Sequence, residues 1–251
     1  MADKAPQVDN LADNLRLLKL DCMRENFTLA AEKAAKNGWD HQAYLAYLVQ
    51  AEADARHDRS IQRRIRLARF PTIKTLDQFD WNWPESIEQA RIKNLFRLNF
   101  LEEKGNVILL GGVGLGKTHL ATAIGYAACL RGKSVLFSST IDVINSLSAA
   151  LAANRLKAEL RKYLAPSLLI LDELGYLPID KRGADLLFQI ISMRYEQNST
   201  LITTNRAFKQ WPEVFNNDTT LTVAMLDRLL HHASVILIEG KSYRMKGQID
   251  A

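Results

Sequence analysis

The sequence predicts an α/β fold in which helices flank a central parallel sheet, preceded by a smaller, all-helical region. The aliphatic runs at 107–110 and 168–171 are typical of strands that are buried on both faces. A helical pattern at 120–128 separates the first run from a further strand, SVLFS at 134–138. This order of strand, helix and strand predicts a crossover between parallel strands. A length of 251 residues suits one large domain, or a small domain joined to a medium one.

Residues 8–69 are expected to be helical throughout. The longest helix is expected to be capped by Asp40 and to run toward Ala68, because no glycine or proline intervenes before Pro71. Almost no acid is expected to offset its later arginines, so their shared face has two interpretations: contact with DNA phosphates, or an ordinary solvated surface. These arginines recur at spacings of three or four residues, and they are Arg56, Arg59, Arg63 and Arg66.

A glycine-rich loop follows the strand at 107–110 and matches the pattern G-x-x-x-x-G-K-[ST]. Glycines permit positive φ and a close backbone approach, so that successive N–H groups can point at phosphate oxygens beside a helix N-terminus. Lys117 is expected to reach the β- and γ-phosphates of ATP, and the Thr118 hydroxyl is expected to coordinate Mg²⁺. A plain strand-to-helix turn is the alternative. The expected nucleotide-binding residues are Gly111, Gly112, Val113, Gly114, Leu115, Gly116, Lys117, Thr118 and His119.

Two acids end the strand at 168–171, at the edge where open α/β sheets bind ligands. Asp172 is expected to hold Mg²⁺ through water, and Glu173 is expected to be the base that orients and deprotonates the attacking water. Acids commonly end strands, but their position after a phosphate loop favours the catalytic interpretation. Asn205 follows a strand at 200–204 and is expected beside the γ-phosphate, with a simple turn asparagine as the alternative.

A boundary is expected at 70–86, where FPTIKTLDQFDWNWPES interrupts the helical period with two prolines. The chain is therefore divided into a helical domain at 1–70, a linker at 71–86 and an α/β domain at 87–251, whose first helix is expected at 87–104. The aromatic residues of the linker have two interpretations: they pack the nucleotide base, or they make core or docking contacts. They are Phe79, Trp81 and Trp83.

A helical insertion is expected at 142–164, with Thr140 or Asp142 as its cap. Its second helix carries basic residues against the single acid Glu159, which makes it a candidate DNA-binding element. The candidate DNA contacts are Arg155, Lys157 and Arg161. Two later arginines, Arg228 and Arg244, have the ordinary interpretation of surface residues that form salt bridges.

Composition excludes other classes of protein. Hydrophobic residues make up 47% and charged residues 24%, no apolar run is long enough for a membrane helix, and the N-terminus lacks a signal-peptide pattern, so a cytoplasmic protein without membrane contact is expected. The net charge of +5 is compatible with a polyanion partner.

Cys22 and Cys129 are expected to be reduced, buried thiols. His119, His231 and His232 have no cysteine or acid at ligand spacing, which favours structural roles over metal binding.

Four blocks together resemble a known family: GGVGLGKTHLA, LLILDELGYLP, RYEQNSTLITTN and LDRL. They resemble the AAA+ ATPases of the helicase-loader clade, and in particular the IstB-like transposition helper proteins of insertion sequences, which accompany a DDE-type transposase. The resemblance covers nearly the whole chain, including its helical N-terminal region.

The resemblance implies specific roles for individual residues. Lys117 and Thr118 match the Walker A residues, Asp172 and Glu173 match the Walker B pair, and Asn205 matches sensor 1. Arg228 occupies the arginine-finger position and Arg244 the sensor 2 position. The insertion at 142–164 matches the initiator-specific motif, which lines a DNA channel in relatives. One departure is that only a handful of residues follow Arg244, so the helical lid common in other AAA+ proteins is expected to be absent or reduced.

The implied function is that of an ATP-dependent homo-oligomer that wraps and remodels duplex DNA through phosphate contacts and recruits or stimulates its transposase, with hydrolysis resetting the complex. Two alternatives remain open. One is a replicative helicase loader that acts on a helicase and single-stranded DNA. The other is a small-molecule P-loop kinase or other metabolic ATPase, against which the arginine-rich helices and the position of Arg228 count.

Overall fold

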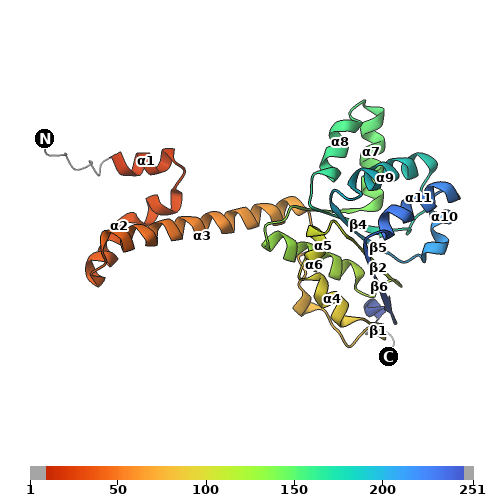
Figure 1. Ribbon diagram of the computed structural model, residues 1–251, viewed down its shortest axis with the longest axis horizontal. Coiled ribbons are helices and arrows are strands. Elements are labelled where there is room, and N and C mark those ends of the chain that lie inside the picture. Colours follow the sequence, from red (N-terminus) through yellow and green to blue (C-terminus); the bar gives the residue numbers. More distant parts are fainter. Residues whose placement is uncertain (1–9, 246–251) are drawn as a thin grey trace. The chain divides into compact units, whose positions relative to one another are not determined.

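The computed structural model describes residues 10–245, which fall into two compact units that divide between Arg63 and Arg64 (Figure 1). The first consists of α1 (Leu11–Leu17), α2 (Asp21–Asn37) and most of α3 (His41–Ala68). Gly38 ends α2 in the left-handed conformation, with φ of 65°, and the Asp40 carboxylate caps α3 by accepting a hydrogen bond from Ala43 N. The predicted helical character of this region is therefore confirmed for the described residues.

The arginine face of α3 differs from the prediction, because two of its arginines pair with acids. The buried Glu52 carboxylate lies 3.1 Å from Arg56 Nε and 3.0 Å from Arg59 Nη2, and Arg59 also lies 3.7 Å from Asp21. Burial alone would raise the pKa of Glu52, but hydrogen bonds from Met23 N and Arg56 hold this pKa below its usual value. The expectation that almost no acid offsets these arginines is therefore wrong for Arg56 and Arg59, since an earlier turn of α3 and the neighbouring α2 supply the acids.

The second unit is built on a six-stranded sheet with the order β1-β6-β2-β5-β4-β3. Its strands are β1 (Ser86–Ile87), β2 (Asn106–Gly111), β3 (Val135–Ser139), β4 (Leu168–Leu174), β5 (Ser199–Thr204) and β6 (Ala233–Glu239). The short β1 pairs antiparallel with β6, and all other pairs are parallel. The predicted α/β fold with a parallel sheet is confirmed, and the carboxyl ends of β2, β4 and β5 meet at one edge.

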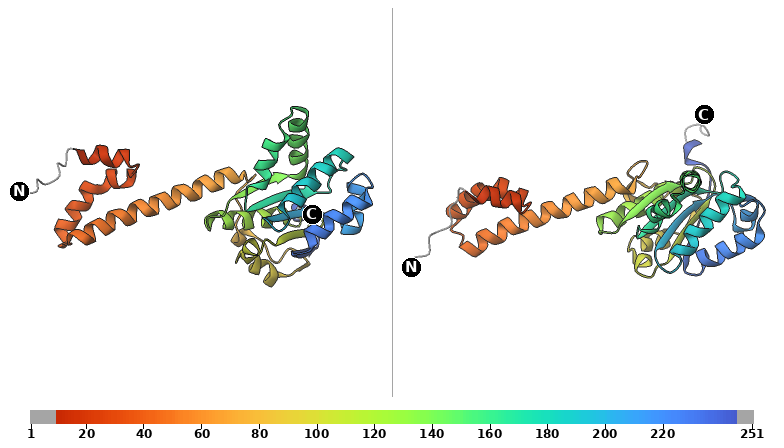
Figure 2. Two further views of the ribbon diagram at one scale, coloured as in Figure 1. Left: turned by 45° about the horizontal axis from the view of Figure 1, so that its top comes forward. Right: turned by 90° about the horizontal axis from the view of Figure 1, so that it is seen from above.

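Helices cover both faces of this sheet, as the two views in Figure 2 also show. Alternate strand residues serve the two cores, so that Leu109 and Ile170 face one layer while Ile108 and Leu169 face the other. The first layer contains α4 (Gln89–Leu95), α5 (Asn99–Glu102) and α6 (Lys117–Leu130). The second contains α7 (Thr140–Ala152), α8 (Leu156–Leu164), α9 (Lys181–Arg194), α10 (Trp211–Val214) and α11 (Thr219–Leu230). Both faces of the sheet are thereby removed from water, which accounts for its continuous aliphatic runs.

Three local predictions are wrong. The single helix expected at 87–104 is two short helices, because Leu98 takes a φ of 64° and breaks the chain direction between them. The cap of α7 is Ser139, whose Oγ accepts from Asp142 N at 3.1 Å. Thr140 is instead buried and donates its hydroxyl to the Asp172 carbonyl. Cys129 is buried as expected, but Cys22 is only half-buried.

The buried side chain of Arg194 ties the second helical layer to the sheet. Its Nη1 donates to the carbonyls of Tyr163 at 2.7 Å, Pro166 at 3.0 Å and Leu164 at 3.3 Å, and its Nη2 donates to the Ser199 carbonyl at 2.5 Å. Burial lowers the pKa of Arg194 to about 9, which leaves the guanidinium charged at neutral pH. The guanidinium therefore supplies hydrogen-bond donors to the carbonyls at the C-terminal end of α8 and links them to the start of β5.

Arg194→Met should lower the free energy of unfolding by about 3 kcal/mol, because several buried carbonyls lose their donor while the thioether fills only the volume. Denaturant unfolding followed by circular dichroism measures this difference. Arg182→Met is the matched control, since Arg182 lies exposed near the start of the same helix and should change stability by less than about 0.5 kcal/mol. Equal stability of the two variants would contradict the role of Arg194 as a clamp.

Within residues 10–245, no helix combines the length and apolar character needed to cross a membrane.

Candidate nucleotide-binding site

The phosphate loop joins the end of β2 to the start of α6. Gly114 and Gly116 have φ of 76° and 83°, a conformation that side-chain-bearing residues rarely adopt. A Cβ at Gly116 would lie 2.6 Å from the Phe79 ring, and one at Gly114 would lie 2.1 Å from the Ser242 hydroxyl. The loop therefore needs glycine both for its backbone and for its neighbours, and it lies at the N-terminus of α6, where backbone N–H groups have no helical partner.

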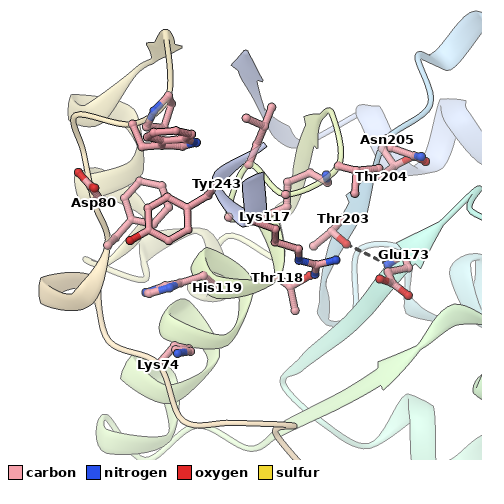
Figure 3. Close-up of a pocket in the computed structure, with 18 of the residues that line it drawn as sticks. Lys74, Asp80, Lys117, Thr118, His119, Glu173, Thr203, Thr204, Asn205 and Tyr243 are labelled. Carbon is pink, nitrogen blue, oxygen red and sulfur yellow. Dashed lines mark hydrogen bonds between the residues drawn. The ribbon is translucent and has the colours of Figure 1, made fainter. Parts of the chain in front are cut away.

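A cavity of about 540 Å³ opens beside this loop. Its walls come from segments that are distant in the sequence: the phosphate loop and the start of α6, the end of β4, the end of β5, and the segments 74–84 and 243–244 (Figure 3). The predicted site residues that line it are Val113, Gly114, Leu115, Gly116, Lys117, Thr118, His119, Glu173, Asn205 and Arg244. The fold thus brings most of the predicted nucleotide site into one cavity at the carboxyl edge of the sheet.

The Lys117 side chain lies among the residues that line the cavity (Figure 3). Its Nζ donates to the Gly111 carbonyl at 2.8 Å and to the Gly112 carbonyl at 2.6 Å. Burial is the main cause that lowers the pKa of Lys117 below its usual value, with Arg244 adding to it, while Asp172 and Glu173 act in the opposite direction. A half-buried ammonium at the mouth of a glycine loop gains favourable interactions from an anionic ligand.

The two acids at the end of β4 have different surroundings. Asp172 is buried, and its carboxylate accepts hydrogen bonds from the Thr118 hydroxyl, at 3.0 Å to each oxygen, and from the Thr203 hydroxyl at 2.5 Å. Glu173 is exposed to the cavity and has a φ of 59°, at the point where the pairing register between β4 and β5 shifts. Asp172 is therefore held in place by the protein, whereas the Glu173 carboxylate is presented to the cavity.

Thr203 joins these two acids and is absent from the sequence-based prediction. Its Oγ1 accepts a hydrogen bond from Glu173 N at 2.9 Å, drawn as a dashed line in Figure 3, while the same hydroxyl donates to Asp172. Thr203 is itself buried. The register between adjacent strands decides this contact, so the sequence signal was limited to the position of Thr203 two residues before Asn205.

The aromatic residues of the predicted linker divide between the two interpretations. Trp81 packs against the core, whereas Phe79 and Trp83 line the cavity, and Phe79 also contributes to the core. His119 lies edge-on to Phe79 and places Nε2 at 2.9 Å from the Thr75 carbonyl. An adenine contact by Phe79 or Trp83 stays a prediction.

The segment after β6 lies against the phosphate loop. Tyr243 N donates to the Gly114 carbonyl at 2.9 Å, and the Trp83 indole donates to the Lys241 carbonyl at 2.9 Å. Tyr243 and Arg244 therefore reach the cavity from a part of the chain far from the loop. Lys74, Asp80, Tyr176 and Tyr243 also line the cavity, although no sequence pattern pointed to them.

Arg228 does not reach this cavity. It lies on α11, where its Nη1 donates to the Ala224 carbonyl at 2.8 Å and its guanidinium carbon lies 5.0 Å from the centre of the Phe188 ring on α9. Among the described residues that line the cavity, Arg228 is absent. A role for Arg228 at a phosphate therefore stays a prediction, and it requires a second copy of the chain.

The candidate DNA contacts of the insertion are also separate from the cavity. Arg155, Lys157 and Arg161 are exposed around α8, which packs against its neighbours through Leu160 and Tyr163. The remaining basic residue of this helix, Lys162, lies 2.6 Å from Glu159. Arg63 and Arg66 of α3 are exposed. The structure leaves these side chains accessible, and DNA binding by them stays a prediction.

The order of the sheet, the helices on both of its faces and the glycine-rich loop define a fold class, that of the AAA+ P-loop domains. The chain superimposes on the DnaC helicase loader with a TM-score of 0.53 and 22% identity, over 66% of this chain and 96% of that one. AMPPCP-bound DnaA from Aquifex aeolicus gives a TM-score of 0.58 and 23% identity, over 71% of this chain and 54% of that one. At this level of identity the likeness establishes the fold.

The chain belongs to the family of IstB-like ATP binding proteins, whose model matches residues 13–251. It is 42% identical to an insertion sequence IS232 ATP-binding protein from Bacillus thuringiensis subsp. berliner, over 94% of each chain. An IS21 ATP-binding protein from Pseudomonas aeruginosa is 40% identical, over 92% of this chain and 87% of that one. The predicted resemblance is confirmed, and this is an ATP-binding protein of the insertion-sequence type.

Proposed function

We propose that this protein is an ATP-hydrolysing transposition helper that assembles on duplex DNA, remodels it, and recruits or stimulates the transposase of its insertion sequence. The main structural observation that supports this proposal is the position of Arg228. The cavity contains a phosphate loop, a candidate metal ligand and a candidate base, but its candidate arginine finger lies elsewhere on α11. Such a site is completed by a neighbouring subunit, which couples ATP to assembly. Membership of a family of insertion-sequence proteins supports the link to transposition.

The residues beside the phosphate loop fit a Mg²⁺ ion. A hydroxyl oxygen of Thr118 and the carboxylate of Asp172 lie 3.0 Å apart, and oxygen donors of this kind are the ligands that Mg²⁺ prefers. When bound there, Mg²⁺ would neutralise phosphate charge. The protein residues supply the rest: Lys117 contacts phosphate oxygens, and Glu173 orients a water molecule and accepts its proton.

Thr203→Val should lower the turnover number for ATP about 10- to 100-fold with little change in KM, because residues that orient metal ligands and catalytic groups commonly have effects of this size. The isosteric change removes the hydroxyl that joins Asp172 to Glu173 N. Steady-state ATPase assays over a range of Mg²⁺ concentrations measure the effect, and Thr203→Ser should restore turnover. Full activity of a folded valine variant would exclude this positioning role.

The proposed DNA surface consists of Arg155, Lys157 and Arg161. Replacing these three residues by glutamine should weaken duplex binding, because each side chain that neutralises a phosphate also releases a counterion. The salt slope of the binding constant should fall by about 1 for every phosphate that is no longer neutralised. Fluorescence anisotropy with ATP at several salt concentrations measures both quantities.

The matched control for this surface is the glutamine triple variant of Arg91, Arg131 and Lys133, which removes the same charge. These residues already have protein partners: Arg91 pairs with Glu88, Lys133 pairs with Glu102, and Arg131 donates to the Arg97 carbonyl. The control should bind DNA nearly as well as the unchanged protein. If both triple variants have equal slopes, the α8 charges form only a solvated face.

Pull-downs test the partner. The tagged protein, loaded with ATP and duplex DNA, should retain the transposase of its insertion sequence and fail to retain the replicative helicase of the host. Capture of the helicase alone would contradict the proposal and favour a helicase loader.

A further inference from the structure

A cluster of candidate metal ligands lies outside the nucleotide site, at the ends of α9 and α11. His231 and His232 follow α11, and Glu196 lies just after α9. The Glu196 carboxylate Oε1 lies 3.8 Å from His231 Nδ1 and 3.9 Å from His232 Nε2, and the three ligand atoms all lie within 4.8 Å of one another. The two histidines were expected to be structural because no acid accompanies them at ligand spacing. Folding supplies that acid from a distant part of the sequence.

The chemistry of these three groups indicates which ion they would bind. Two imidazole nitrogens and one carboxylate oxygen form a donor set typical of Zn²⁺ and related transition-metal ions, and a water molecule commonly completes a tetrahedron. Mg²⁺ and Ca²⁺ prefer ligand sets composed of oxygen atoms, so this cluster discriminates against them.

The spacing also fits such an ion. Ligands about 2.05 Å from a tetrahedral ion lie about 3.3 Å from one another. The two separations from Glu196, 3.8 and 3.9 Å, exceed this value by about half an ångström, and the two histidine nitrogens lie within 4.8 Å of each other, so small side-chain rotations bring the three atoms to ligand spacing. All three side chains are more than half exposed, at 52%, 56% and 54% for His231, His232 and Glu196, so their rotation is not obstructed by a packed core.

The neighbouring Tyr195 contacts one of the candidate ligands, His231, and helps to orient its ring. Its hydroxyl lies 2.7 Å from His231 Nδ1. A tyrosine phenol is protonated at neutral pH and is able to donate a hydrogen bond. A phenol that donates to Nδ1 requires a lone pair on that nitrogen, and this is the form in which a histidine binds metal. Metal binding would replace this hydrogen bond.

We propose that Glu196, His231 and His232 form a binding site for a Zn²⁺-class divalent ion. Such an ion would join the end of α9 to the end of α11. The same α11 carries Arg228, one turn before the histidines, where it already contacts Phe188 of α9. The ion would therefore fix the helix end that presents Arg228, and the site itself does not depend on the proposed ATPase function.

Competition between the full-length protein and a chromophoric zinc chelator tests this site, at pH 7.5 without nucleotide. The unchanged protein should bind one Zn²⁺ per chain, and binding should resist a 100-fold excess of Mg²⁺. His232→Ala and the isosteric Glu196→Gln should each weaken that binding at least tenfold. Zn²⁺ should also raise the thermal midpoint of the unchanged protein and have a smaller effect on both variants.

Other candidate zinc ligands are controlled in the same experiment. His41→Ala and His57→Ala remove exposed histidines elsewhere and should leave affinity unchanged. All measurements are made in a Cys22→Ser background, because Cys22 is half-buried, whereas burial raises the pKa of Cys129 to about 11 and removes its thiolate at pH 7.5. Undiminished affinity in folded His232→Ala and Glu196→Gln proteins, or an absence of binding to the unchanged protein, would overturn the proposal.

Discussion

Arg228→Ala should lower the turnover number for ATP by about 10³- to 10⁵-fold while leaving ATP affinity nearly unchanged, the range that trans-acting arginines contribute in phosphoryl-transfer enzymes. The physical reason is the location of Arg228. Its guanidinium lies against Phe188, outside the cavity of its own chain, so its removal takes nothing from the local phosphate contacts. Turnover measured with ATP and duplex DNA, together with nucleotide binding followed by a fluorescent analogue, separates the two effects.

A mixing experiment tests whether this arginine acts on a neighbouring subunit. Lys117→Ala should abolish ATP binding but keep Arg228, whereas Arg228→Ala keeps an intact phosphate loop. Mixed at equal concentration, the two inactive proteins should recover part of the activity, because some interfaces then combine a working loop with a working arginine. Normal turnover by Arg228→Ala alone would exclude the finger, and inactivity of every mixture of the folded variants would contradict action between subunits.

Arg228→Ala also removes the cation–π interaction between Arg228 and Phe188. This loss should cost only about 0.5–1 kcal/mol of stability, which thermal unfolding can verify.

Glu173→Gln should reduce turnover by about 10²- to 10⁴-fold, because an amide of the same shape cannot accept a proton from water. ATP binding should persist, since Lys117, Thr118 and Asp172 are untouched. The variant should therefore accumulate in the ATP-bound, DNA-associated form. Single-turnover kinetics with radiolabelled ATP measure the chemical step, and analytical ultracentrifugation with DNA measures the assembly.

The two acids at the end of β4 should respond differently to replacement by their amides. Asp172→Asn should weaken the Mg²⁺ dependence of ATP binding, because Asp172 is buried against Thr118 and Thr203, whereas Glu173→Gln should leave this dependence intact. Glu213→Gln is the matched control, since Glu213 is an exposed glutamate on α10 that does not line the cavity. Full turnover by Glu173→Gln would remove Glu173 as the base.

Much of the site could be predicted because its chemistry is local in the sequence. The loop from Gly111 to Thr118 needs its glycines in consecutive order, and the aliphatic strand before Asp172 identifies itself by composition. Asn205 and Arg244 were also expected at the site, and both line the cavity. Contacts between distant segments had no such signal. Thr203 meets Asp172 only through the register of two strands, and Tyr243 meets Gly114 only because the chain after β6 returns to the loop.

Some errors in the prediction have the same origin and others do not. The prediction overlooked Glu52, which lies four residues before Arg56 on the same helix and pairs with Arg56 and Arg59, whereas Asp21 reaches Arg59 from α2. Leu98 breaks a helix that its neighbours would otherwise continue, because packing of the short helices on either side outweighs the cost of a left-handed residue. Local patterns do not contain these long-range terms.

By itself, the sequence determined the fold class, the phosphate loop, the acid pair and the family, since each depends on hydrophobic periodicity or on residues close together in the chain. Tertiary structure alone decided which residues share a cavity, that Thr203 connects the two acids, that Arg228 lies outside its own site, and that Glu196 meets two histidines. The physical reason is that strand order, register and helix docking result from burying apolar surface across the whole unit. Polar groups from remote segments are brought together by that burial, and their own sequence surroundings do not reveal it.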